Sequence, residues 1–142
     1  MAKASALYRV ASVLLILFAV GHTVGFLKFK APSVEGRAVW DSMNNVHFRL
    51  GRASSSYGGF YIGFGLFATL YLLFAAYLAW HLGGLARSNP QAIGALGWMF
   101  FAVQVVSLVL SWKYFLPPPV ILSGLVAICL GWASWLVGTA VA

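Results

Sequence analysis

Acidic side chains are almost missing from this sequence, in which Glu35 and Asp41 are the two acids among 142 residues. Charged residues of both signs make up 8% of the chain, whereas a soluble domain carries about 25%. A water-exposed surface cannot be built from so few charges. The composition therefore excludes a soluble globular protein.

Cysteine is equally scarce, because Cys129 is the single cysteine and lies inside an apolar run. One cysteine excludes an intrachain disulfide and disfavours a structural zinc site, which needs several Cys, His or carboxylate ligands. The long apolar runs contain no Asp or Glu, and this disfavours proton-coupled transport through a carboxylate within the membrane. Phosphate-binding loops, nucleophile elbows and metalloprotease motifs are absent as well. We therefore expect no metal site.

Apolar residues are what the sequence has in abundance, at 62% of the chain with a mean hydropathy of +0.91. A helix of about 20 apolar residues crosses the hydrocarbon core of a bilayer. Four segments qualify, namely 8–27, 58–82, 92–112 and 120–141. A backbone in lipid must satisfy its own hydrogen bonds, so each segment is predicted to be helical. The predicted fold is all-α, a transmembrane four-helix bundle that forms a single domain over residues 1–142.

The connection between the first two spans is long enough to hold structure of its own. Within it Val39, Met43, Val46 and Leu50 are spaced by four, three and four residues, the pattern of one helix face. We expect an additional interfacial helix over about 34–52, lying at the membrane surface or in the mouth of the bundle.

The net charge of +7 is spread unevenly over the two sides of the predicted bundle. The side with the long connection (the loop side) carries six Lys or Arg, and the side with both chain ends (the terminal side) carries three. Basic residues favour the cytoplasm, so the loop side is predicted to be cytoplasmic, although the margin narrows to four against three if Arg49 and Arg52 face a buried site. Basic residues that flank apolar spans meet anionic headgroups, so we expect membrane lipid and no nucleic acid as a partner.

Two G-x-x-x-G patterns lie toward the loop side of the first two spans. Gly21 and Gly25 form one, and Gly59 and Gly63 form the other. Small residues at this spacing let membrane helices approach closely. We expect these two helices to pack through their glycines, or a homo-oligomer to form through them.

Polar residues also gather on the loop side. His22 lies five residues before the end of the first span, about 8 Å inside it. Polar groups in hydrocarbon line an interior or a water-filled cavity, so a cavity beneath the long connection is predicted. Taken singly, His22 can equally be a satisfied core histidine, and Gln104 can simply join two helices. The predicted ligand-binding residues are Asn44, Asn45, Arg49, Arg52, Tyr61, Gln104, Ser111 and Trp112.

Acid–base chemistry at this cavity would fall to His22, His47 and Asp41, the predicted catalytic residues. The two histidines are the ones that can share a side, and Asp41 could orient one of them. The alternative is that Asp41 pairs with an arginine on a surface helix. Haem ligation by His22 and His47 needs the loop helix to insert deeply, so the pattern disfavours haem.

The run Gly21-His22-Thr23-Val24-Gly25-Phe26, followed by Lys28, resembles a group of small uncharacterised bacterial membrane proteins. More distantly the chain resembles the DoxX-like four-helix families, whose first span also ends in a Gly-rich turn with a following lysine. The shared motif covers about ten residues, and the four-span layout covers the whole chain. The resemblance implies a multi-pass protein of the bacterial inner membrane with a four-helix fold.

The sequence thus favours a membrane protein that binds a small lipophilic molecule, such as a quinone, an isoprenoid or another lipid, with acid–base or redox chemistry as an open question. Whether the protein is an enzyme is not decided by the residues. The alternative is a non-enzymatic helix-packing subunit or a small transporter.

Overall fold

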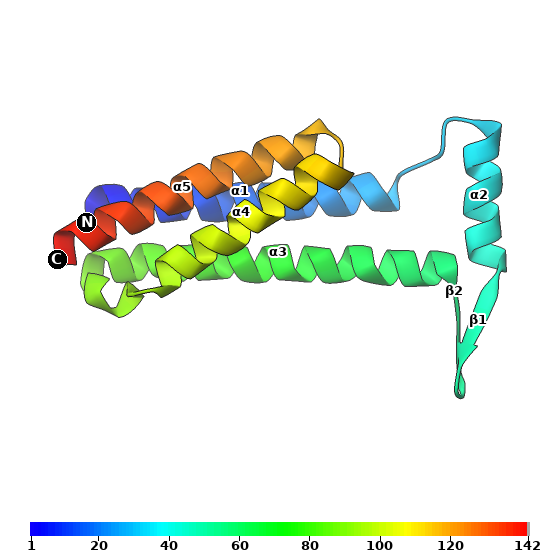
Figure 1. Cartoon of the computed structure of the whole chain (residues 1–142), viewed down its shortest axis with the longest axis horizontal. Coiled ribbons are helices and arrows are strands. Elements are labelled where there is room, and N and C mark those ends of the chain that lie inside the picture. The colour runs from blue at the N-terminus through cyan, green and yellow to red at the C-terminus, as the bar shows by residue number, and fades with distance from the viewer. Residues whose placement is uncertain (142) are drawn as a thin grey trace. The chain divides into compact units, whose positions relative to one another are not determined.

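The computed structural model describes residues 1–141 and is almost entirely helical (Figure 1). Its helices are α1 (Ala2–Leu27), α2 (Val34–Asn45), α3 (Tyr57–Ser88), the short 3-10 helix η1 (Pro90–Ile93), α4 (Leu96–Tyr114) and α5 (Pro117–Val141). Two strands, β1 (His47–Leu50) and β2 (Ala53–Ser56), form an antiparallel hairpin. Helices α1, α3, α4 and α5 are long and apolar enough to cross a membrane. The prediction of a helical protein with four membrane-length helices is confirmed.

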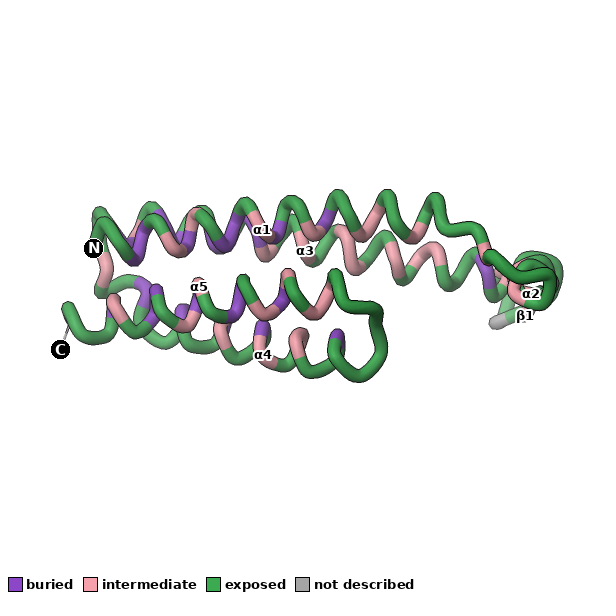
Figure 2. The backbone as a smooth tube through the Cα atoms, turned by 90° about the horizontal axis from the view of Figure 1, so that it is seen from above, coloured by how far each residue is buried: buried purple, intermediate pink, exposed green. Residues whose placement is uncertain are grey.

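The chain divides into two compact units. Unit 1 contains Met1–Phe18 and the chain from Leu72 onward, and unit 2 contains Ala19–Tyr71. The buried apolar core, which includes Tyr8, Leu15 and Leu130, lies in unit 1. Figure 2 shows the buried positions recurring along one side of α1 and of α5. Unit 2 contains the long connection and both acids.

Serine side chains join α1 to α3 within unit 1. Ser5 Oγ donates to the carbonyl of Gly83 at 2.6 Å, and Ser12 Oγ donates to the carbonyl of Ala76 at 2.7 Å. Both donors and both acceptors are seven residues apart, which is the repeat of two helices that supercoil left-handedly. Small side chains at these positions allow the two helices to approach closely, and the serine hydroxyls form hydrogen bonds with backbone carbonyls of the facing helix.

Three helices of unit 1 meet at a further buried hydrogen bond. The hydroxyls of Tyr8 on α1 and Ser134 on α5 lie 3.1 Å apart, and both side chains are buried. Gly97 of α4 lies directly against them, since a Cβ built there would be 2.7 Å from Tyr8 Oη and 2.8 Å from Ser134 Oγ. Further along, Gly131 of α5 lies against the ring of Phe101. Glycines thus set the approach of α4 and α5.

The two G-x-x-x-G patterns do not make the predicted contacts. A Cβ built at Gly21, Gly25 or Gly63 meets nothing within 4 Å, and one at Gly59 meets only the nearby hydroxyls of Ser55 and Ser56. The expectation that these glycines pack α1 against α3 was wrong. A spacing of four residues identifies a helix face but not the side from which a partner approaches.

The helix in the long connection is shorter than predicted. Ser33 caps α2, its Oγ accepting from the amide of Gly36 at 3.0 Å, and the helix ends at Asn45 instead of near residue 52. The chain then forms the hairpin, whose two-residue turn places Gly51 at φ +60°. A two-residue turn with glycine at its first position matches the twist of a hairpin. The half-buried face of α2 is Gly36, Trp40 and Met43, whereas Val39 and Val46 are exposed.

Candidate functional site

A polar cluster lies within unit 2, where the end of α1 meets α3. His22 Nε2 is 3.1 Å from the carbonyl oxygen of Gly65. A carbonyl oxygen only accepts, so Nε2 carries the proton and donates. In the tautomer that donates from Nε2, the lone pair lies on Nδ1, which has no hydrogen-bond partner among the described residues. His22 is half-buried.

Two threonines extend this cluster by one helical turn. The hydroxyls of Thr23 and Thr69 are 2.7 Å apart, and Thr23 Oγ1 also lies 2.7 Å from the carbonyl of Ala19. Thr69 Oγ1 lies 3.2 Å from the carbonyl of Gly65, the same oxygen that His22 contacts. The two threonine hydroxyls have two protons for three contacts, namely those with Ala19, with Gly65 and with each other. Rotation of the hydroxyls can therefore change which contacts are hydrogen bonds without moving a heavy atom.

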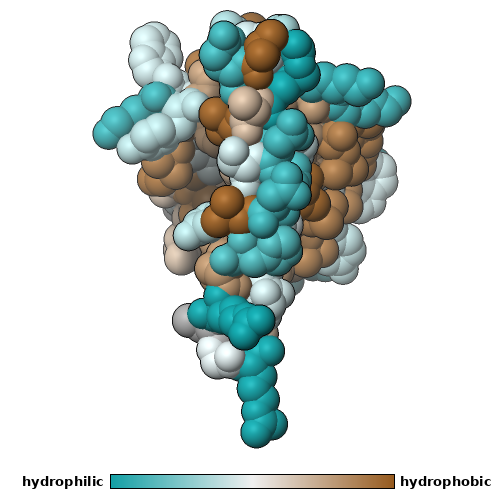
Figure 3. Space-filling view, turned by 90° about the vertical axis from the view of Figure 1, so that its right-hand side faces the viewer, coloured by the Kyte–Doolittle hydropathy of each residue, from teal (hydrophilic) through white to brown (hydrophobic). Residues whose placement is uncertain are grey.

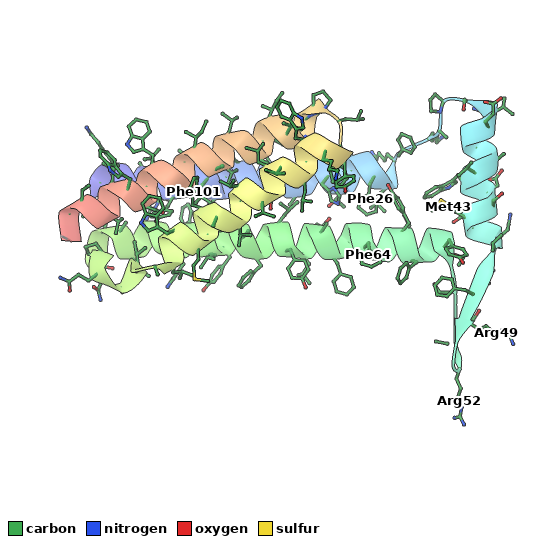
Figure 4. The ribbon with its side chains drawn as sticks, in the orientation of Figure 1. Phe26, Met43, Arg49, Arg52, Phe64 and Phe101 are labelled. Carbon is green, nitrogen blue, oxygen red and sulfur yellow. The ribbon has the colours of Figure 1, made fainter. Side chains whose placement is uncertain are left out.

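Phe26 closes one side of the cluster. Its ring centroid lies 5.1 Å from that of His22. A Cβ built at Gly65 would be 2.6 Å from the Phe26 ring, so glycine is what lets the ring lie against α3 (Figure 4). The imidazole is therefore held by a carbonyl at Nε2 and by an aromatic ring beside it, which fixes its orientation.

Aromatic rings cover the start of α3 and tie α2 and the hairpin to it. Trp40 of α2 meets Tyr61 edge to face at 5.8 Å between centroids, and Phe48 of β1 lies 5.7 Å from Phe60. Phe60 in turn meets Phe64 at 4.7 Å. Aromatic pairs at these distances stabilise their contacts beyond the area they bury. We call these rings, with Tyr57, the aromatic cluster; its α3 members remain about half exposed.

His47 and Asp41 do not join His22 in a hydrogen-bonded set among the described residues. His47 is exposed on β1, and its Nδ1 bonds the carbonyl of Asn45 at 3.0 Å. Asp41 is exposed on α2. Both belong to unit 2, but each has a separate environment.

The remaining predicted residues of unit 2 lie on the connection and on α3. Asn44 donates from Nδ2 to the carbonyl of Trp40 at 2.9 Å, and its amide occupies the space that a side chain at Gly58 would need. Arg49 and Arg52 are exposed on the hairpin and point away from α3 (Figure 4). Figure 3 shows that the outer face of α2 and the hairpin is largely hydrophilic. Tyr61 belongs to the aromatic cluster.

Gln104, Ser111 and Trp112 lie on α4 in unit 1. Gln104 is buried, and its Nε2 donates to the carbonyl of Ser123 at 3.5 Å. The hydroxyls of Ser111 and Ser123 are 3.4 Å apart, and both residues are buried. Trp112 is 79% exposed. The polar face of α4 therefore serves the contact with α5, which is the packing role that the sequence left open for Gln104.

No family model, curated protein or solved structure matches this chain. The resemblance to the DoxX-like families and the assignment to the bacterial inner membrane stay predictions. Function must therefore be argued from the geometry of the two units.

A shallow cavity of about 170 Å³ lies within unit 1. It is lined by Pro90, Gln91, Ile93, Gly94, Trp98, Ser134, Val137 and Gly138. Among the described residues, no group of three His, Cys, Asp or Glu side chains could hold a metal ion.

Sequence reasoning missed Thr69 and Gly65, which complete the cluster around His22. The available signal was that Thr69 is the one serine or threonine between Ser56 and Ser88, in an otherwise apolar run. A single hydroxyl in such a run bonds either its own helix or a neighbour. Gly65 carries no motif, and its role follows only from its contact with Phe26.

Proposed function

We propose that this protein is a multi-pass protein of the bacterial inner membrane that binds a small lipophilic molecule beside His22. The ligand class is a quinol-type molecule, an isoprenoid alcohol or a lipid that carries a hydroxyl group. The observation that carries the proposal is the hydrogen bond from His22 Nε2 to Gly65, which commits one imidazole nitrogen and leaves the other as an acceptor.

The acceptor nitrogen suits a hydroxyl donor in a low-dielectric environment. A hydrogen bond inside a protein is stronger than one in water. His22 Nδ1 would accept a proton or a hydrogen bond from the ligand, and Gly65 would hold the ring in place. Of the three predicted acid–base residues, His22 is the one that the proposal keeps at the ligand.

The aromatic cluster supports a lipophilic partner. Half-exposed rings such as Tyr57, Phe60 and Tyr61 offer an aromatic surface in the same unit as His22. Binding sites for small lipophilic molecules combine aromatic lining with a few polar groups that set orientation. The proposal therefore assigns the ring or chain of the ligand to the aromatic side chains and its hydroxyl to His22.

The test is to identify what the full chain retains during purification in a mild detergent. Bound lipids are extracted and measured by mass spectrometry for the wild type, for His22→Ala and for the control His81→Ala, whose histidine lies in unit 1 stacked on Tyr77. His22→Ala removes the hydrogen bond between the imidazole and the hydroxyl of the ligand, so retention of the ligand should fall by about tenfold. The control should match the wild type, and circular dichroism should show the same helix content in all three.

Equal retention by His22→Ala and the wild type would refute the proposal, as would a wild type that retains no lipophilic molecule. An absorbance scan of the wild type tests the haem alternative. A Soret band would show that the bound molecule is haem and not the proposed ligand.

A second candidate is the non-enzymatic helix-packing subunit, which the open glycines of α1 favour. Gly21 and Gly25 leave a face on which no described residue packs. A helix from a second copy could approach closely there. Chemical crosslinking in membranes would decide between the candidates, because Gly21→Leu should abolish crosslinked oligomers under this alternative and leave lipid retention unchanged.

A further inference from the structure

Arg9 of α1 is held over the ring of Trp80 of α3, in unit 1. The guanidinium carbon lies 4.7 Å from the ring centroid, within the range of a cation–π attraction. Gly83 makes room for the stem of the arginine, because a Cβ built there would be 3.1 Å from Arg9 Cγ. The hydrogen bond from Ser5 to Gly83 holds the two helices together at this level. The guanidinium is thus positioned by packing.

The hydrogen-bonding groups of Arg9 are not used by this packing. Its Nε is enclosed and has no hydrogen-bond partner among the described residues. Arginine can contact an aromatic ring through the face of its guanidinium, whereas its N–H groups point outward in the plane of the group. The edge formed by the two Nη groups is therefore the one that remains for a ligand. Such an edge matches the oxygens of a phosphate in a bidentate arrangement.

The charge of Arg9 has no side-chain counterion within unit 1. Both acids of the chain, Glu35 and Asp41, belong to unit 2. Unit 1 carries the cations Lys3, Arg9, Arg87 and Lys113 and no carboxylate side chain. A cation that packs among apolar helices is stabilised only when it pairs with an anion or reaches water. No side chain of unit 1 can therefore supply that anion.

The positions of Arg9 and Trp80 along their helices place both near a membrane surface. Arg9 is seven residues from the start of α1, about 10 Å along the axis, and Trp80 is eight residues before the end of α3, about 12 Å. Tryptophan concentrates at the level of lipid headgroups, and arginine extends toward that level from inside a span. We propose that Arg9, stacked on Trp80, binds the phosphate of an anionic phospholipid on the terminal side.

An anionic lipid fits better than a zwitterionic one. A zwitterionic headgroup brings its own cation, which would add to the unbalanced positive charge of unit 1. Arg87 follows Gly83 by one helical turn and is exposed, so it adds to the positive potential on the same side of α3. The expected preference is therefore for headgroups with a net negative charge, such as phosphatidylglycerol.

The experiment measures which lipids the purified full chain retains from vesicles of equal phosphatidylglycerol and phosphatidylcholine. The wild type should enrich phosphatidylglycerol, and Arg9→Gln should lower that enrichment by about tenfold, the loss expected for a charge-assisted hydrogen bond. Arg9→Lys, which keeps the charge but lacks the planar fork, should give an intermediate value. Lys113→Gln is the matched control, because it removes one charge beside an aromatic ring, Tyr114, elsewhere in unit 1.

The proposal fails if the wild type shows no preference, or if Arg9→Gln keeps the wild-type preference while its helix content is unchanged. Adding inorganic phosphate separates the two sources of the anion. Displacement of the retained phosphatidylglycerol by phosphate alone would assign the site to a free anion and overturn the lipid assignment. If Lys113→Gln loses as much enrichment as Arg9→Gln, the preference follows from net charge, and the specific site is refuted.

Discussion

Gly97 illustrates how a missing side chain decides a contact between three helices. Its Cα lies where Tyr8 of α1 and Ser134 of α5 share a hydrogen bond, and both partners are buried. Tyr8 is 0% exposed, so it has no free space into which it could move. A methyl group at position 97 must therefore separate the two hydroxyls or push α4 away.

We predict that Gly97→Ala lowers the free energy of unfolding by about 1–3 kcal/mol, the usual effect of overpacking. Gly138→Ala is the control, because it lies on α5 in the same unit and a Cβ there meets nothing within 4 Å. That substitution should leave the free energy of unfolding within about 1 kcal/mol of the wild type, or raise it, since alanine favours helix. Denaturation of the detergent-solubilised chain followed by circular dichroism measures both. Similar destabilisation of the two variants would contradict the assigned contact.

His22 shows how far single residues could be predicted. Its importance followed from a polar side chain within an apolar span, and the structure gives it a specific partner in Gly65. Asp41 and His47 were grouped with it because the sequence places them on one side. Knowing on which side of a membrane a residue lies does not tell which residues it contacts. Asp41 and His47 both lie exposed on other elements than His22.

Among the elements, the hairpin depends on one backbone conformation. Gly51 has φ +60°, which side chains other than glycine adopt only with strain, and it begins the two-residue turn between β1 and β2. The tyrosine amide at the start of α3 bonds the carbonyl of Val46 at 3.3 Å, so the hairpin also positions the start of α3. Disturbing the turn should affect the strands first.

We predict that Gly51→Ala destabilises the hairpin by about 1 kcal/mol, the effect of forcing an L-residue into this region. Hydrogen exchange at the amides of residues 47–56 should become several-fold faster, in proportion to that loss. Exchange in α4 and α5 should not change, because the hairpin belongs to unit 2. Ala53→Gly is the control, because it changes a residue beside the turn without forcing a side chain into a positive φ. Uniform acceleration across the chain would show that the effect is not local.

Element boundaries were predictable where apolar length decides them and less so elsewhere. The four long helices were expected, and α1 indeed ends at Leu27. The fourth span was predicted to begin at residue 120, yet α5 begins at Pro117, because proline lacks only an amide that the first turn does not use. The helix predicted to residue 52 ended at Asn45, since a glycine turn and three serines favour a hairpin over a helix. Periodicity over four apolar residues could not distinguish the two.

For the whole molecule, burial and charge are divided between the two units. Unit 1 holds the buried core and no acid, whereas unit 2 holds both acids, the hairpin and the cluster around His22. Composition predicted the membrane-length helices because hydropathy sums over many residues. It could not predict which glycines pack, since that depends on the rotation of each helix about its own axis.

Membrane orientation is the property that the charge distribution of the whole chain predicts. The loop side carries more Lys and Arg than the terminal side, so the hairpin should face the cytoplasm and the end of α3 should face outward. Single cysteines at exposed positions test this when Cys129 is replaced by alanine. In intact cells a membrane-impermeant maleimide should label Ser88→Cys and leave Ser54→Cys unlabelled, and permeabilised cells should label both. The reverse pattern would place the hairpin outside and show that Arg49 and Arg52 do not act as flanking charges. Labelling of both positions in intact cells would mean that they lie on the same side and that α3 does not cross the membrane.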